Sequence, residues 1–174
     1  MKKVYNVLLL ILCGFFFMMF ALGSSSEVDS SNYDTDKIYS IGETLDCPAF
    51  DITVDKVEMK PKGTRIDSLQ VIDDPEWIGV TLTVKNKSDE TETFYGDDVN
   101  LINANGEVLE HSWVTYEIWG TGLLNSPELV SGGSKTGYIQ FSNNSTDNSN
   151  LTLQVNCNTG LFDDDIIYKV NVSQ

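Results

Sequence analysis

The stretch Glu76-Trp-Ile-Gly-Val-Thr-Leu-Thr-Val-Lys-Asn86 decides the fold of this chain. From Ile78 onward, apolar and other residues alternate, so that one side of an extended chain would carry Ile78, Val80, Leu82 and Val84. A period of two with β-branched residues is typical of a strand that has one buried face. Turn-forming residues at 86–89 then end the strand. We therefore predict a central strand, on or beside which the other apolar runs pack.

Short apolar runs, separated by turn residues, recur along the rest of the chain. They lie at residues 41–47, 50–58, 99–102, 137–141, 151–155 and 168–172. Asn105-Gly106 lies between two apolar runs and predicts a tight hairpin in which both turn residues have positive φ. Beyond the N-terminal segment, the sequence shows no sustained helical period. The pattern predicts an all-β fold, an antiparallel β-sandwich of seven to nine strands.

The N-terminus has the pattern of an export signal. Lys2 and Lys3 precede an apolar run over residues 7–22, and Ala21-Leu22-Gly23 offers small residues for cleavage. Residues 1–23 are therefore predicted to form a signal peptide or, if uncleaved, a helical signal anchor, with the rest of the chain outside. Residues 24–37 read as a flexible polar tether and residues 38–174 as the folded domain. Lipidation at Cys13 is disfavoured, because Leu12 stands where lipoprotein processing needs a small residue.

The formal net charge is −15, and every Asp and Glu lies after the N-terminal apolar run. A domain this acidic repels nucleic acid and anionic membrane surfaces. The charge serves solubility, or it fits a basic or cation-rich partner.

Two cysteines remain in the exported part. Cys157 continues the apolar row of Leu151, Leu153 and Val155, and Cys47 continues from Leu45, so both are expected to face the core. Exported proteins meet an oxidising environment, which makes Cys47 and Cys157 a disulfide candidate. The alternative is two buried free thiols that act as small apolar residues.

Trp113, Tyr116 and Trp119 lie close together in the least regular part of the sequence. On an exposed loop they would form a candidate partner surface for a sugar or a protein. Alternatively, the segment folds over the open end of the sandwich and the rings plug the core.

The sequence offers no recognisable catalytic set. His111 is the single histidine, which excludes a histidine-rich zinc site, and no nucleophile-elbow pattern accompanies it. Acidic clusters at residues 73–74, 97–98 and 163–165 could seat calcium, but none has calcium-loop spacing, and solvated loop charge is the simpler interpretation. We assign no catalytic, cofactor-binding or metal-binding residue and expect no cofactor.

Four pieces of sequence, in order, resemble a known family. They are Ile41-Gly-Glu43, Trp77-Ile-Gly-Val-Thr-Leu-Thr-Val-Lys-Asn-Lys-Ser88, Asp98-Val-Asn-Leu-Ile-Asn-Ala-Asn-Gly106 and Val130-Ser-Gly-Gly-Ser-Lys-Thr-Gly-Tyr-Ile-Gln-Phe141. Over about residues 38–172 the chain resembles the small secreted immunoglobulin-like domain of unknown function found in bacterial surface lipoproteins, related to the immunoprotective extracellular antigen. The resemblance implies an immunoglobulin-like sandwich, an extracytoplasmic location and no agreed catalytic residues. The chain departs from the lipoprotein members because it lacks a proper lipobox.

Taken together, these features predict an extracytoplasmic, non-enzymatic binding or adhesion module, secreted or anchored at a bacterial cell surface by its N-terminal segment. Its partner would be an unidentified protein or cell-surface component, reached through sandwich loops or an exposed edge strand. The alternative is a module that binds a small ligand or a metal ion such as calcium, and a hydrolase ranks third.

Overall fold

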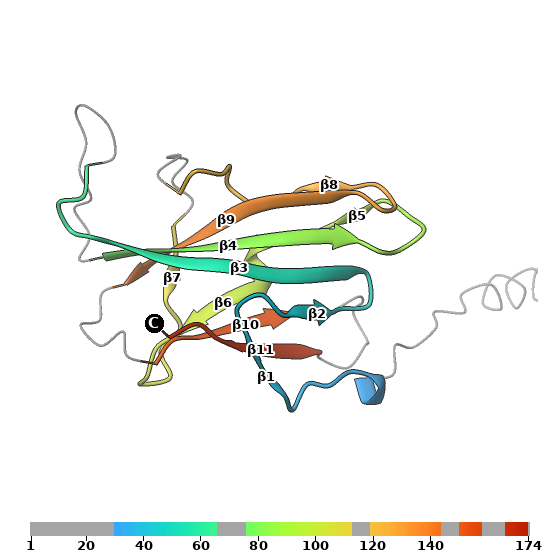
Figure 1. Ribbon diagram of the computed structural model, residues 1–174, viewed down its shortest axis with the longest axis horizontal. Helices are drawn as coiled ribbons and strands as arrows, with labels where there is room; N and C mark the ends of the chain where they lie inside the picture. Colours follow the sequence, from blue (N-terminus) through green and yellow to red (C-terminus); the bar gives the residue numbers. More distant parts are fainter. Residues whose placement is uncertain (1–29, 66–75, 113–118, 144–149, 158–165, 174) are drawn as a thin grey trace, which may run out of the picture.

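The computed structural model describes residues 30–65, 76–112, 119–143, 150–157 and 166–173. Two sheets lie face to face (Figure 1). One sheet has the order β1-β11-β10-β6, and the other has the order β2-β3-β4-β9-β7, with a separate two-stranded ladder of β5 and β8. This architecture confirms the predicted immunoglobulin-like β-sandwich.

The strand bounds are β1 Ile38–Ser40, β2 Thr44–Asp46, β3 Phe50–Pro61, β4 Glu76–Asn86, β5 Glu92–Thr93, β6 Val99–Ile102, β7 Glu110–His111, β8 Glu128–Leu129, β9 Ser134–Asn143, β10 Thr152–Asn156 and β11 Ile167–Asn171. Two short 3-10 helices, η1 (Ser30–Asn32) and η2 (Gly96–Asp98), complete the described elements. The described strands outnumber the predicted seven to nine because β5, β7 and β8 have two residues each, too few to give an alternating pattern.

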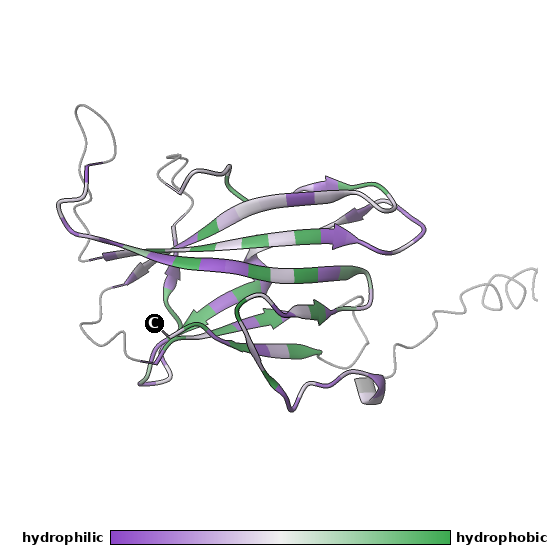
Figure 2. Cartoon of the chain, in the orientation of Figure 1, coloured by the Kyte–Doolittle hydropathy of each residue, from purple (hydrophilic) through white to green (hydrophobic). Residues whose placement is uncertain are grey.

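The inner face of β4 is the row predicted from the sequence. Ile78, Val80, Leu82 and Val84 are all 0% exposed. They belong to one core with Leu101, Leu153, Val155 and Val170 from the facing sheet. Figure 2 shows the corresponding green bands alternating along β3 and β4. Burying a large aliphatic side chain contributes about 1.5–3 kcal/mol, so this row is a main source of stability.

The outer face of β4 differs from the prediction of a single buried face. Trp77, Gly79 and Thr81 are also buried, so the first half of the strand is covered on both sides. The strand is also hydrogen-bonded along both edges, to β3 over residues 50–61 and to β9 over residues 134–143.

Two local predictions are corrected by backbone conformation. The first strand, predicted over residues 41–47, is interrupted at Gly42, whose φ is +89°. The chain therefore leaves β1, which pairs in parallel with β11, and enters β2 in the other sheet. In the hairpin after β6, Gly106 has a positive φ but Asn105 does not. The turn is closed by a hydrogen bond from the Gly106 N–H to the Asn103 carbonyl oxygen.

Order begins before the predicted domain start at residue 38. Tyr33 packs against the core, and the Tyr39 hydroxyl lies 3.5 Å from the Asp34 carbonyl oxygen. The predicted signal or anchor, and the tether up to residue 29, lie outside the described residues. Within the described part, no helix is long and apolar enough to cross a membrane.

A disulfide joins the two sheets. Cys47 directly follows β2 and Cys157 directly follows β10. The arrows of these two strands point toward the same end of the sandwich (Figure 1). The Cα atoms are 5.4 Å apart, and the residues are separated by 110 positions in the sequence. The bridge therefore closes most of the domain into one covalent loop.

We expect the double variant Cys47→Ala/Cys157→Ala to lower the free energy of unfolding of residues 24–174 by about 2–5 kcal/mol, because a loop this long restricts the unfolded chain strongly. Urea unfolding with and without reductant measures the effect. Reductant should lower the midpoint of the parent protein and leave that of the variant unchanged; an unaffected parent would contradict a bridge in solution.

Candidate functional site

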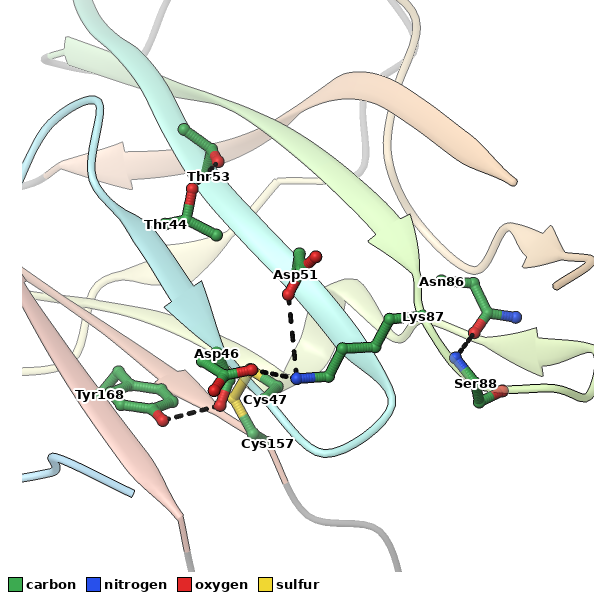
Figure 3. A network of polar contacts seen from close by, with 10 residues as sticks. All are labelled: Thr44, Asp46, Cys47, Asp51, Thr53, Asn86, Lys87, Ser88, Cys157 and Tyr168. Atoms are coloured by element: carbon green, nitrogen blue, oxygen red, sulfur yellow. Dashed lines mark hydrogen bonds and ion pairs between the residues drawn. A yellow bond between two sulfur atoms is a disulfide. The ribbon is translucent and has the colours of Figure 1, made fainter. Parts of the chain in front are cut away.

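The end of the sandwich that carries the disulfide is fastened by polar contacts as well (Figure 3). The Tyr168 hydroxyl donates a hydrogen bond of 2.8 Å to the Asp46 carbonyl oxygen, which links the two sheets beside the bridge. Lys87 pairs with the Asp46 carboxylate, and its Nζ lies 3.8 Å from Asp51 Oδ1. Burial raises the pKa of Tyr168, so its hydroxyl remains a donor throughout the physiological range.

Beside this bridge lies a cavity of about 220 Å³, which we call the disulfide pocket. Three stretches of chain line it: the turn between β2 and β3 with the start of β3, the segment from β5 to η2, and the end of β10 with Cys157 after it. The lining residues are Cys47, Ala49, Phe50, Ile52, Glu92, Thr93, Phe94, Tyr95, Asp98, Asn156 and Cys157. The pocket is therefore formed where the two sheets and a connecting segment meet.

Buried backbone and amide contacts hold the segment from β5 to η2 in place. The side chain of Asn86, which is 0% exposed, donates from Nδ2 to the carbonyl oxygens of Glu90 and Leu129. β5 pairs with β8, and further along the Phe94 N–H donates to the Pro127 carbonyl oxygen. This wall of the pocket is thus tied to the β8 segment rather than carried on a free loop.

The pocket combines aromatic and acidic groups. Phe50 and Phe94 meet edge to face, with ring centroids 6.0 Å apart. Tyr95 is 55% exposed, an unusual degree for a large aromatic side chain on this domain. Glu92 and Asp98 add two carboxylates, and none of the described lining residues is basic.

Asp98 is the carboxylate whose environment is most unusual. It is partly buried, and its side chain makes no hydrogen bond or ion pair within the described part of the chain. Burial, and after it the neighbouring carboxylate of Asp97, raise the pKa of Asp98 above its ordinary value. A raised pKa means that the charged form is held at a cost to folding, as expected of a carboxylate without a partner.

The predicted aromatic surface is corrected at Trp119, the one member of the three that is described. Trp113 and Tyr116 lie outside the described residues. Trp119 is 3% exposed, so it is not available to a partner. Its indole lies on Gly79 on the outer face of β4, and its Nε1 donates a 2.8 Å hydrogen bond to Gln140 Oε1. The ring therefore covers the outside of a sheet; it neither forms a binding surface nor plugs the open end of the sandwich.

The other candidate site residues from the sequence are His111 and the acidic clusters. His111 Nε2 lies 2.7 Å from the Val99 carbonyl oxygen, and its ring packs against Phe141. Of the acidic clusters, residues 73–74 and 163–165 lie outside the described residues. Among the residues with described positions, no three His, Cys, Asp or Glu side chains are grouped as a metal site would require.

Sequence reasoning missed the pocket residues Phe50, Glu92, Phe94 and Tyr95, and it considered Asp98 only as part of the acidic cluster at 97–98. Phe50 is far in the chain from the segment 92–98 that carries the others, and no spacing within that segment signals a cavity. The one local signal was Phe94-Tyr95, two adjacent aromatics of which only one can face the core of an extended segment.

We expect Trp119→Ala to cost about 3–5 kcal/mol of stability, the usual range for a buried large aromatic. Gly79→Ala should also destabilise, by about 1–3 kcal/mol, because its added Cβ would lie 2.4 Å from the indole. Urea unfolding of both single variants and the double variant tests the contact. The loss from Gly79→Ala should shrink in the Trp119→Ala background, and additive losses would contradict it. Gly122→Ala, with nothing within 4 Å of the new Cβ, is the matched control.

We expect Asp98→Asn to raise the melting temperature at neutral pH, by up to a few degrees, because the charged carboxylate is disfavoured in the folded state. Since the folded pKa is raised, this cost is present above that pKa and disappears as pH falls through it. The advantage of the variant over the parent should therefore shrink by about pH 4, where the unfolded carboxyl is also protonated. Thermal unfolding across this range measures it, and Asp97→Asn should give a smaller gain because Asp97 is the lesser of the two causes of the raised pKa. A variant that is less stable than the parent at neutral pH would overturn this account of Asp98.

Comparison with solved structures finds a similar fold in several bacterial proteins, among them the following three. The yjhA protein from Bacillus subtilis is 24% identical, with a TM-score of 0.60, over 77% of this chain and 99% of that chain. A functionally unknown protein from Listeria monocytogenes is 15% identical, with a TM-score of 0.56, over 78% and 85%. A candidate lipoprotein, ycdA from Bacillus subtilis, is 13% identical, with a TM-score of 0.52, over 74% of this chain and 38% of that chain. At these identities the likeness shows the fold alone.

No curated protein matches the chain. Residues 39–168 match a family described as a domain of unknown function, DUF4352. That match runs from β1 to β11 and includes both sheets, the disulfide and the disulfide pocket. The chain therefore belongs to the DUF4352 family of domains of unknown function.

Proposed function

We propose that this protein is an extracytoplasmic, non-enzymatic binding module of a bacterial cell surface, and that it meets its partner with the end of the sandwich that carries the disulfide pocket. The observation that carries the proposal is the pocket itself, with Tyr95 exposed at a cavity of about 220 Å³. Tyrosine is one of the residues most enriched at the centres of protein interfaces. The partner would be a protein or another cell-surface component.

Three features support the location. The N-terminal sequence has the pattern of an export signal or anchor. A disulfide between sheets is suited to an oxidising compartment and rare in the cytosol. One protein of similar fold is a candidate lipoprotein. A relation to the immunoprotective extracellular antigen, which the sequence resemblance implied, belongs to the same proposal.

The absence of a recognisable catalytic pattern in the sequence supports a binding role over catalysis. The single histidine contacts the Val99 carbonyl oxygen through Nε2 and packs its ring against Phe141. The net charge of −15 argues against nucleic acid as the partner. A small-ligand module is the second candidate, and the presence of a cavity of about 220 Å³ favours it.

Fluorescently labelled protein comprising residues 24–174 should bind to cells of the source bacterium saturably. Tyr95→Ala should weaken this binding about tenfold or more, as truncating an interface aromatic does. The measurement is a titration by flow cytometry, with circular dichroism to show that the variant is folded.

Val108→Ala is the matched control. Val108 is 58% exposed, like Tyr95, but pairs with Ile102 in the hairpin at the opposite end of the sandwich. Equal binding by the parent and by Tyr95→Ala would refute the assignment of this end, and loss of binding in the control alone would move the interface to the other end.

A further inference from the structure

We propose that the disulfide pocket binds an organic ammonium group with an apolar body, either a small free amine or the side chain of a lysine presented by a partner. The inference deepens the proposed function and rests on it for the biological setting. The binding itself is a property of the pocket that can be tested without any partner.

The volume and the apolar lining of the pocket suit a small chemical group rather than a large molecule. Its volume, about 220 Å³, is below the range of about 300–1,000 Å³ that is usual for sites of drug-sized ligands. The apolar floor comes from Phe50, Ile52, Phe94 and the disulfide. A ligand that enters must therefore bring an apolar part of modest size, such as an alkyl stem or a single ring.

The charge of the lining selects a cation. Glu92 and Asp98 both line the pocket, and the described part of the lining holds no basic residue. Lys87, which approaches this end of the sandwich, is engaged with Asp46 and Asp51. A cationic ligand would meet two carboxylates whose charge no lining lysine or arginine offsets, whereas an anionic ligand would be repelled.

The aromatic lining favours an organic cation over a metal ion. An ammonium group can interact with the faces of Phe50 or Phe94 while it approaches the carboxylates. Calcium would need six to eight oxygen ligands. The described lining supplies two carboxylates together with the neutral polar side chains of Thr93 and Asn156, and among residues with described positions no three His, Cys, Asp or Glu side chains are grouped as a metal site would require.

The state of Asp98 gives a second reason. A partly buried carboxylate without a hydrogen bond or ion pair within the described chain is destabilising, and a neutral apolar ligand would remove more of its water without replacing it. An ammonium group would offset that loss, so a cationic ligand should bind more tightly than its neutral isostere.

The test is an NMR titration of isotopically labelled residues 24–174 with benzylammonium and with benzyl alcohol. We expect saturable shifts in residues of the disulfide pocket, with benzylammonium binding at least about fivefold more tightly than the alcohol, roughly the worth of one partly buried charge pair. Blocked lysine amide and blocked norleucine amide form a second pair. If the lysine compound binds, the ligand is the side chain of a partner's lysine. If only benzylammonium binds, the ligand is a small free amine. Both results support the proposal.

Asp98→Asn should weaken benzylammonium binding at least about fivefold, while Asp97→Asn, which removes the same charge one residue outside the pocket, should change it less than about twofold. Ala49→Leu, which fills the cavity without altering charge, should also abolish binding. If Asp97→Asn and Asp98→Asn weakened benzylammonium binding equally, the attraction would come from the overall negative charge of the domain, and the proposal would be overturned. It would also be overturned by equal binding of the alcohol, by binding of calcium alone, or by no binding at all. Cell-surface binding that persists without amine binding would leave the proposed function standing and sink this inference alone.

Discussion

Strand β4 is buried on its inner face, hydrogen-bonded along both edges and, over its first half, buried on its outer face as well, and the positions of the other elements follow from this constraint. Its inner row packs on the opposite sheet, while β3 and β9 satisfy its backbone on either side. The outer face then has to be covered by something that neither sheet supplies. The segment at 119–124 does this by crossing the edge of β9, with Trp119 outside the sheet and Leu124 in the core. Two glycines make room for it, since Gly79 lies under the indole and Gly137 faces Leu124.

These glycines show what a strand can gain by giving up side chains. Glycine in a strand weakens it, because it costs conformational entropy and leaves nothing to pack. Here the missing side chains are replaced by a tryptophan and a leucine from another segment. That segment also hydrogen-bonds to the edge of β9 through Gly122, Leu124 and Tyr138. A single excursion of the chain therefore covers a face, fills the core and protects an edge that would otherwise invite association with another sheet.

Local period explains what the sequence could predict. The inner row of β4 is visible because alternation is a property of adjacent residues, and the core-facing positions of Cys47 and Cys157 were inferred from Leu45 and Val155 by the same rule. Burial of the outer face was not visible, because Gly79 has no side chain to signal a partner. The parallel pairing of β1 with β11 was not visible either, because the chain changes sheets after β1 at a turn that contains Gly42 with positive φ. The disulfide pocket was beyond sequence reasoning, because Phe50, Asp98 and Cys157 come together only when three distant segments meet.

The acidic residues of the domain differ in their surroundings. Glu43 and Glu58 pair with Lys37 and Lys56 at exposed positions, where ion pairs contribute little to stability and serve solubility. Asp98 is different, because it is held partly out of water beside a cavity and without a compensating group in the described chain. Solubility would be served equally well by a fully exposed carboxylate, and the raised pKa of Asp98 indicates that its charged form is disfavoured in the folded state. A partly buried carboxylate beside a cavity, with its pKa raised by burial, is a local cost that the ligand-binding role proposed for the disulfide pocket would explain.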